Sequence, residues 1–244
     1  MKKTLIALLA LTGIATAAPL TLSSKAVSYG SSTTLTTGNQ AMTWDDASVV
    51  YTNWYMTFSF TELVDNSTTI GSRWVSTICT DASQNPRKGL AASVSLVGTE
   101  KSPQITFGTG GEFYSTSLGT RPTLGFSAND TLTMAVYENY AYLGNQKSKK
   151  YVSIKLSDLT IAEGSDSKMT SGGARAFANS NSTKIGATTI ASLDNLPIPN
   201  GEILDITKLV TTGVAMTQSI PEPTTATLSL LALAGLAARR RRKH

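Results

Sequence analysis

The sequence predicts an all-β protein: an antiparallel β-sandwich (jelly roll), flanked by an N-terminal signal peptide and a single C-terminal hydrophobic helix. Three observations support this prediction. Apolar and polar residues alternate in several short segments, which is the period of a half-buried strand. Gly, Asn, Asp, Pro or Ser bound each segment and indicate turns. The body is rich in Thr and Ser, a composition that favours strands over helices.

The chain divides into five predicted segments. They are a signal peptide (1–17), a loose lead-in (18–39), the sandwich domain (40–210), a linker (211–220) and a sorting signal (221–244). About 200 residues lie between the two signals, enough for one β-sandwich with its own core.

The N-terminus has the three parts of a secretory signal. Lys2 and Lys3 precede an apolar stretch at 5–14, and Ala15-Thr16-Ala17 forms an Ala-x-Ala cleavage site. The apolar part is too short for a stable membrane span. We therefore expect export by the secretion machinery and a mature chain that starts near Ala18 after cleavage by signal peptidase. The alternative is a buried N-terminal helix.

The strand signals follow along the body. The strongest alternation covers 54–61, 74–79, 131–136 and 152–157, and weaker candidates are 90–97, 104–107, 141–143, 184–187 and 189–193. In the first of them, Trp54, Met56, Phe58 and Phe60 share one face of the strand. Many short strands at this spacing are typical of a sandwich or jelly roll.

Other segments lack the period of two. Residues 164–181 are rich in Ser, Gly and Asn and predict a long surface loop. Near the end of the domain, Ile203, Ile206, Leu209 and Val210 recur at helical spacing, which predicts one short helix.

The C-terminus has the pattern of a signal that directs the chain to the membrane. Pro221-Glu222-Pro223 is followed by the uncharged residues 224–238 and by a basic tail at 239–244. As a helix, 224–238 would reach roughly 22 Å, which is marginal against a hydrocarbon core of about 30 Å. The basic residues would stay in the cytoplasm, leaving Pro-Glu-Pro outside. The residues that set this topology are Arg239, Arg240, Arg241, Arg242 and Lys243.

This order of motif, apolar segment and basic stop resembles the PEP-CTERM sorting domain, which exosortase-type membrane enzymes process in bacteria that make extracellular polysaccharide. The resemblance implies that Pro221, Glu222 and Pro223 are recognised by such an enzyme. It also implies a membrane-anchored intermediate that moves to the cell surface or extracellular matrix, with extracellular polysaccharide as a further partner. The alternative is a plain tail anchor with a chance Pro-Glu-Pro.

The charge of the chain does not indicate nucleic-acid binding. The chain has 21 Lys and Arg against 16 Asp and Glu. Without the basic residues of the two signals, 14 basic residues remain, and the body is near −2. The high isoelectric point therefore describes the signals, and we expect no nucleic-acid partner.

The body also resembles laminin-G-like, concanavalin-A-type lectin domains. The resemblance lies in the aromatic strand at 54–60, a central hairpin at 129–145, an Ile-Gly strand at 184–186 and the run Leu193-Asp194-Asn195-Leu196-Pro197-Ile198. It implies a sandwich that binds glycan. The prolines of that run favour an edge or a bulge over a central strand.

The residues point to binding or structure more than to catalysis. No strand contains Glu-x-Asp or Glu-x-Glu, the pattern that would place two carboxylates on one face. Cys79 is the only cysteine and predicts a buried side chain, and His244, the only histidine, lies in the basic tail. We therefore expect a non-enzymatic protein. Alternatives are a glycoside hydrolase with a split carboxylate pair, and a purely structural surface protein.

The candidate ligand-binding residues are Trp44, Asp45 and Asp46, because this aromatic residue lies in a polar stretch. Further aromatic candidates are Trp54, Trp74, Tyr114, Tyr140 and Tyr142. An aromatic residue in an alternating strand usually belongs to the core, which is the interpretation favoured for Trp54 and Trp74. We expect no cofactor. The spacing of Asp45, Asp46, Asp81 and Asn85 does not demand a Ca²⁺ site, although oxygen ligands are present.

Overall fold

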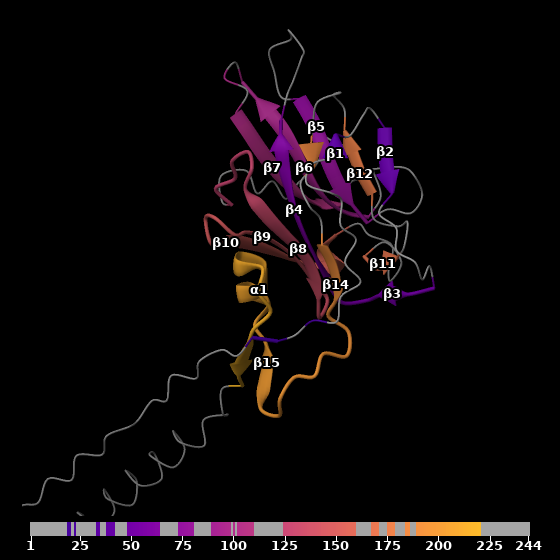
Figure 1. Ribbon diagram of the computed structural model, residues 1–244, viewed down its shortest axis with the longest axis vertical. Coiled ribbons are helices and arrows are strands. Elements are labelled where there is room, and N and C mark those ends of the chain that lie inside the picture. The colour runs from indigo at the N-terminus through magenta and orange to yellow at the C-terminus, as the bar shows by residue number, and fades with distance from the viewer. Residues whose placement is uncertain are drawn as a thin grey trace, which may run out of the picture.

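The computed structural model describes most of the body of the chain. The described residues are 19–20, 22, 33–34, 38–41, 48–63, 73–80, 89–98, 100, 102–109, 124–159, 167–170, 175–178, 184–185 and 189–220. They form antiparallel sheets with one α-helix among them, which confirms the predicted all-β sandwich (Figure 1).

The larger sheet has the strand order β1-β13-β4-β8-β9-β10, and β14 also pairs with β4. Its strands are β1 (Thr33–Thr34), β13 (Lys184–Ile185), β4 (Trp54–Glu62), β8 (Thr131–Tyr137), β9 (Tyr140–Asn145), β10 (Lys150–Lys155) and β14 (Thr189–Ser192). The central strands β4 and β8 come from segments with the strongest alternation, whereas β9, a weaker candidate, lies between β8 and β10, and β10, a strong candidate, lies at the edge.

The second sheet has the order β2-β12-β5-β6-β7. Its strands are β2 (Gly38–Ala41), β12 (Arg175–Ala178), β5 (Arg73–Cys79), β6 (Leu90–Val97) and β7 (Ser102–Thr109). The sequence interpretation found β5, β6 and part of β7. It did not find β12, which lies inside the predicted surface loop at 164–181.

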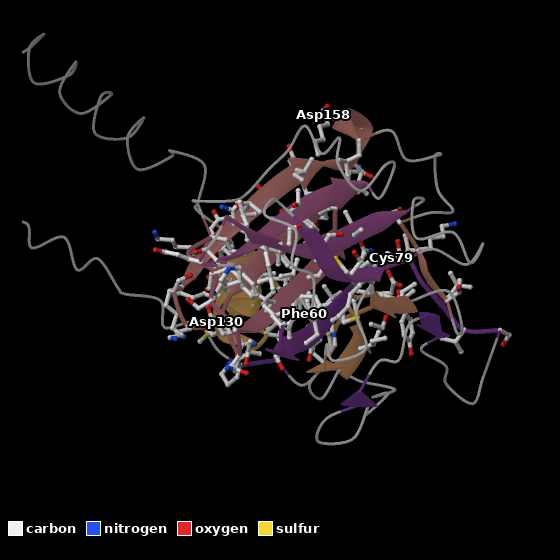
Figure 2. The ribbon with its side chains drawn as sticks, turned by 90° about the horizontal axis from the view of Figure 1, so that it is seen from above. Phe60, Cys79, Asp130 and Asp158 are labelled. Atoms are coloured by element: carbon white, nitrogen blue, oxygen red, sulfur yellow. The ribbon has the colours of Figure 1, made fainter. Side chains whose placement is uncertain are left out.

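The main core lies between the two sheets. Trp54, Met56, Phe58 and Phe60 of β4 are all fully buried in it, as their shared face predicts. Phe60 lies at the centre of the molecule in Figure 2, with its ring edge-on to Phe58 at 5.6 Å between centroids. The opposite sheet contributes apolar side chains of β5, β6 and β7, namely Ile78, Leu90, Ala92, Val94, Leu96, Ile105 and Phe107.

A second core covers the outer face of the larger sheet. Helix α1 (Ile206–Thr212) packs there on β8, β9 and β10 (Figure 1). Asp205 caps its N-terminus by accepting the Lys208 amide, and Gly213 ends it in the left-handed conformation. Gly144 of β9 permits this packing, since a Cβ at that position would collide with the backbone of Val210.

Five small elements complete the described chain. Strands β3 (Val50–Tyr51) and β11 (Met169–Thr170) pair with each other, and the 3-10 helix η1 (Leu156–Asp158) follows β10. Strands β15 (Glu202–Leu204) and β16 (Thr217–Ser219) form a two-stranded ribbon beyond α1.

Some local predictions were wrong. The surface loop predicted at 164–181 contains β11 and β12, because these short strands are held by distant partners and have no period of their own. Ile203 lies in β15 and not in the helix, which begins after the Asp205 cap. The stretch 211–220, predicted as a linker, contains the end of α1 and strand β16.

Both predicted signals lie mostly outside the described residues. This holds for 1–18 and for 221–244, which include the predicted apolar segment at 224–238. Within the described part of the chain, no helix combines the length and the apolar character needed to cross a membrane.

Candidate functional site

Many predicted site residues fall outside the described part of the chain. These are Trp44, Asp45, Asp46, Ala15, Ala17, the motif Pro221-Glu222-Pro223 and the basic residues Arg239, Arg240, Arg241, Arg242 and Lys243. Tyr114, Asp81 and Asn85 also fall outside it. Their roles therefore stay predictions.

The aromatic candidates that are described separate into core and surface. Trp54 is fully buried, and its indole Nε1 donates to the Ser167 carbonyl at 2.7 Å. It is therefore a core residue, as favoured from the sequence. Tyr140 and Tyr142 of β9 lie on the outer face of the larger sheet, since Ala141 and Leu143 between them are in the main core.

Strand register brings further tyrosines to this outer face. Tyr137 of β8 is the direct partner of Tyr140, and Ser153 of β10 is the partner of Tyr142. Tyr151 follows two residues away on the same face of β10. We call Tyr137, Tyr140, Tyr142 and Tyr151 the tyrosine surface.

The tyrosine surface is part apolar support and part exposed platform. Tyr137 and Tyr142 are half-buried against the second core beside α1. Tyr140 and Tyr151 are 40% and 44% exposed, and the rings of Tyr140 and Tyr142 lie 6.3 Å apart with a 41° tilt. Two rings are thus held in place while two present their faces to solvent.

The two half-buried tyrosines of this surface, Tyr137 and Tyr142, have pKa values raised above the ordinary tyrosine value. Burial raises the pKa of Tyr142, and the neighbouring Tyr140, Glu138 and Tyr151 act in the same direction. Burial and the Glu138 carboxylate likewise raise the pKa of Tyr137. Both hydroxyls can therefore donate as well as accept hydrogen bonds.

The polar rim comes from the same strands. Ser153 and Lys155 of β10 are exposed opposite Tyr142 and Tyr140, and Glu138 is exposed in the β8–β9 turn. A hydroxyl, an ammonium and a carboxylate therefore surround the exposed rings. The sequence interpretation named Tyr140 and Tyr142. It missed Tyr137 and Tyr151, which only strand register brings to the same face.

A surface depression of about 570 Å³ lies beside the β8–β9 turn and is lined by residues 49–53, 192, 194 and 195. Asp194 is one of its lining residues. Its carboxylate accepts from the amides of Thr52 at 2.7 Å and Asn53 at 2.9 Å, and from Asn53 Nδ2 at 2.9 Å. Asn53 Oδ1 in turn accepts from the Glu138 amide at 3.2 Å. Asp194 is therefore a clamp that joins the start of β4 to the β8–β9 turn.

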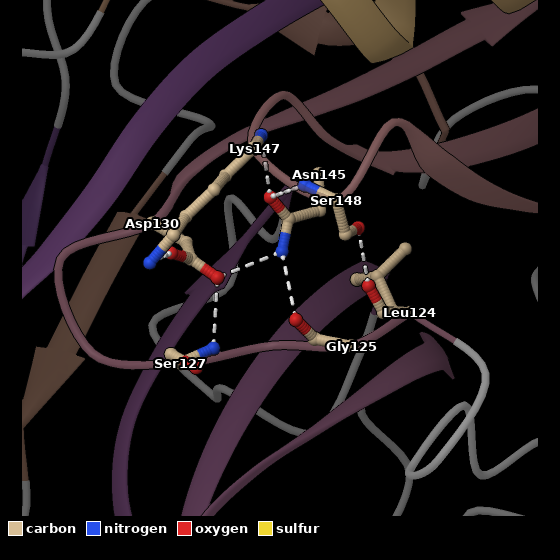
Figure 3. Close-up of polar contacts among 7 residues, drawn as sticks. All are labelled: Leu124, Gly125, Ser127, Asp130, Asn145, Lys147 and Ser148. Carbon is tan, nitrogen blue, oxygen red and sulfur yellow. Dashed lines mark hydrogen bonds and ion pairs between the residues drawn. The ribbon is translucent and has the colours of Figure 1, made fainter.

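A second buried carboxylate, Asp130, also organises turns (Figure 3). It is 3% exposed and accepts from the Ser127 amide and from Asn145 Nδ2, each at 2.8 Å. The Lys147 ammonium lies 3.4 Å away and neutralises the charge. The fully buried Asn145 also donates to the Gly125 carbonyl at 3.3 Å, so this network ties the chain before β8 to the β9–β10 turn.

Three carboxylates of the body, including the two just described, accept hydrogen bonds from groups of the protein itself. Asp194 accepts three bonds, Asp130 accepts two bonds and an ion pair, and Asp205 caps α1 and accepts from the Thr207 hydroxyl at 2.7 Å. Among the described residues, no three His, Cys, Asp or Glu side chains gather as a metal site. Cys79 is fully buried, as predicted.

Comparison with known proteins identifies the C-terminal end. Residues 219–243 match the PEP-CTERM protein-sorting motif, which confirms the predicted sorting signal. The chain is therefore an exported protein that is transiently anchored in the membrane and processed by an exosortase. No curated protein matches the chain. The likeness of the body to laminin-G-like lectin domains stays a prediction.

Proposed function

We propose that this exported PEP-CTERM protein is a non-enzymatic protein of the cell surface or extracellular matrix, and that its body binds polysaccharide through the tyrosine surface. The observation that carries the proposal is the pair of exposed rings, Tyr140 and Tyr151, supported by two half-buried tyrosines and a polar rim. The lectin-like resemblance of the body agrees with this proposal.

The chemistry of the tyrosine surface suits a sugar chain. One face of a pyranose ring is lined by C–H groups and stacks on an aromatic ring, whereas its edge carries hydroxyls. The exposed faces of Tyr140 and Tyr151 offer the stacking surface. The tyrosine hydroxyls and the rim residues Ser153 and Lys155 offer donors and acceptors for the sugar edge.

The occupied carboxylates support a binding role over hydrolysis. A glycosidase needs one carboxylic acid to donate a proton and a second carboxylate to act as nucleophile or base. Asp130, Asp194 and Asp205 all hold backbone amides instead. A carboxylate committed to such amides is held in place as a structural hydrogen-bond acceptor.

Affinity electrophoresis tests the proposal. The exported form would run in gels that contain neutral or acidic bacterial polysaccharides, and the retardation gives a dissociation constant. We expect Tyr140→Ala and Tyr151→Ala each to weaken binding about five- to tenfold, the loss of about 1 kcal/mol per stacked ring. Tyr140→Phe should keep most of the affinity, because the ring remains.

Glu100→Ala is the control, since Glu100 is exposed and lies next to the turn between β6 and β7 of the other sheet. It should bind as the unsubstituted protein does. If no polysaccharide in the panel retards the protein, or if both alanine variants bind unchanged, the tyrosine surface is not a glycan site. A purely structural role would then be favoured.

A further inference from the structure

The described fold ends immediately before the sorting motif. Strand β16 stops at Ser219, and the Ile220 amide donates to the Gly201 carbonyl at 2.9 Å. Pro221 is the next residue, so no free linker separates the folded body from Pro-Glu-Pro. The apolar segment begins at Thr224, and four residue steps span at most about 14 Å. The ribbon of β15 and β16 is therefore held close to the membrane while the anchor is in place.

The mature N-terminus leaves from the same end of the body. Pro19 forms a bridge with Met216, and the Leu20 amide donates to the Ala215 carbonyl at 2.8 Å. Before signal peptide cleavage, both membrane-directed segments thus start beside β16. Two tethers at one end orient that end toward the bilayer.

This end of the molecule exposes three large apolar side chains. Ile203 is 41% exposed, Val214 is 48% exposed and Ile220 is 48% exposed. Leu204 and Ala215, which follow Ile203 and Val214 in the chain, are buried. Ile203 lies in β15, whereas Val214 precedes β16 and Ile220 follows it directly. We call Ile203, Val214 and Ile220 the ribbon face.

Strand register places two of these residues on one side of the ribbon. Ile203 pairs with Gln218, and the hydrogen bond from Ile220 to Gly201 continues the same ladder. Positions 203 and 201 share a side, as do 218 and 220, so Ile203 and Ile220 are diagonal neighbours. Such a cluster is costly to leave in water at an end that is tethered near lipid.

We propose that the ribbon face inserts into the outer interface of the lipid bilayer while the protein is anchored. The predicted anchor favours this contact. Residues 224–238 would span roughly 22 Å of a core about 30 Å thick, so a short anchor draws Pro-Glu-Pro toward the headgroups and the ribbon follows. The inserted face holds the processing motif at the depth of the membrane surface. This inference does not depend on glycan binding by the tyrosine surface.

Site-specific fluorescence in vesicles tests the inference. The anchored chain, with its signal peptide removed, would be reconstituted alone into phosphatidylethanolamine–phosphatidylglycerol vesicles. An environment-sensitive dye would be attached to Ile203→Cys, Val214→Cys or Val50→Cys. Val50 is a matched control, because it is 47% exposed but lies on β3. Native Cys79 is fully buried, and the unsubstituted protein measures its residual labelling.

Quenching by lipids that carry a nitroxide on the headgroup is the readout. We expect about threefold stronger quenching at positions 203 and 214 than at 50, because an interfacial apolar face lies about 5–10 Å deep. Equal quenching at all three positions would overturn the inference. A second outcome would also overturn it: a dye at position 203 that is shielded from water, is not quenched by the lipid nitroxide, and changes its signal with the protein density in the vesicle. Such a result would indicate contact between copies of the protein.

A second variant separates apolar insertion from mere proximity to the anchor. With the dye at position 214, Ile203→Ser combined with Ile220→Ser should reduce quenching about twofold, since both remaining apolar side chains of the ribbon face are lost. Val50→Ser should leave it unchanged. If the double variant is quenched as strongly as the parent, the tether alone explains the contact and the ribbon face has no role.

Discussion

Two single carboxylates, the half-buried Asp194 and the buried Asp130, hold loops of this protein in place. Asp194 accepts the Thr52 and Asn53 amides, and Asp130 accepts the Ser127 amide and the Asn145 side chain. In both cases one carboxylate replaces the hydrogen bonds that water would give to the turn. The sequence shows Asp194 within the lectin-like run 193–198, but its partners are 141 and 142 residues away, so the clamp is visible only in the structure.

Asp194→Ala should lower the free energy of unfolding by about 2–4 kcal/mol, because two backbone amides and one side-chain amide lose a charged acceptor. Urea unfolding of the exported form measures this change. Asp158→Ala is the matched control, since the Asp158 carboxylate is exposed and accepts the neighbouring Ser157 hydroxyl at 3.2 Å. A loss no larger than that of the control would show that Asp194 is not a clamp.

Helix α1, on the outer face of the larger sheet, is positioned by a close approach between its backbone and that of a strand. Helix α1 lies against β9 at Gly144, where any side chain would meet the Val210 backbone. Seven residues are too few to form a stable helix alone, so α1 depends on the caps at Asp205 and Gly213 and on Leu209 and Val210, which are fully buried. The apolar spacing predicted a helix here, whereas its docking site came from the sheet.

Gly144→Ala should destabilise the protein by about 1–3 kcal/mol, because the helix backbone must move away from the sheet. Thermal unfolding measures the loss, and hydrogen exchange at the Leu209 and Gly213 amides, which bond to Asp205 and Leu209, should increase. Ser153→Ala is the control, because Ser153 is exposed on the face of β10 that belongs to the same side of the sheet as α1. It should change neither the thermal stability nor the exchange of these amides. An unchanged exchange rate in Gly144→Ala would mean that α1 tolerates the added methyl without moving.

At the scale of the whole molecule, the two ends carry the predicted export signal and the sorting signal, and the body carries the surface that we propose binds polysaccharide. The sorting motif at 219–243 begins at the last residue of β16, so the motif follows the folded body directly in the chain. The tyrosine surface lies on the face of the larger sheet beside α1, and the ribbon face lies at the tethered end. The ribbon face is the one for which we propose contact with lipid, and the tyrosine surface is the one for which we propose contact with polysaccharide.

The intact mass of the exported protein tests whether the signals at both ends are removed. We expect a species that begins near Ala18 and has lost the apolar segment and the basic tail. Replacing Pro221, Glu222 and Pro223 together by Ala should leave the tail on and keep the protein in the membrane fraction, because the processing enzyme has no motif to recognise. An exported species that retains 239–244 would contradict processing.

The sequence by itself determined the C-terminal sorting signal, the all-β class and the central strands β4 and β8, while the N-terminal export signal stays a prediction. These follow from local properties: runs of apolar residues, blocks of charge, and a period of two that needs no knowledge of the partner strand. It also found Tyr140 and Tyr142, because they alternate with core residues of one strand.

Only the tertiary structure decided where these pieces meet. Strands of two residues such as β3 and β11 are too short to show a period in the sequence, and each forms because it pairs with the other. Tyr137 and Tyr151 join the tyrosine surface through register, and Ile203 leaves the helical pattern because β16 pairs with it. Contacts between residues distant in the chain set these outcomes, and no local pattern encodes which distant partner a residue will find.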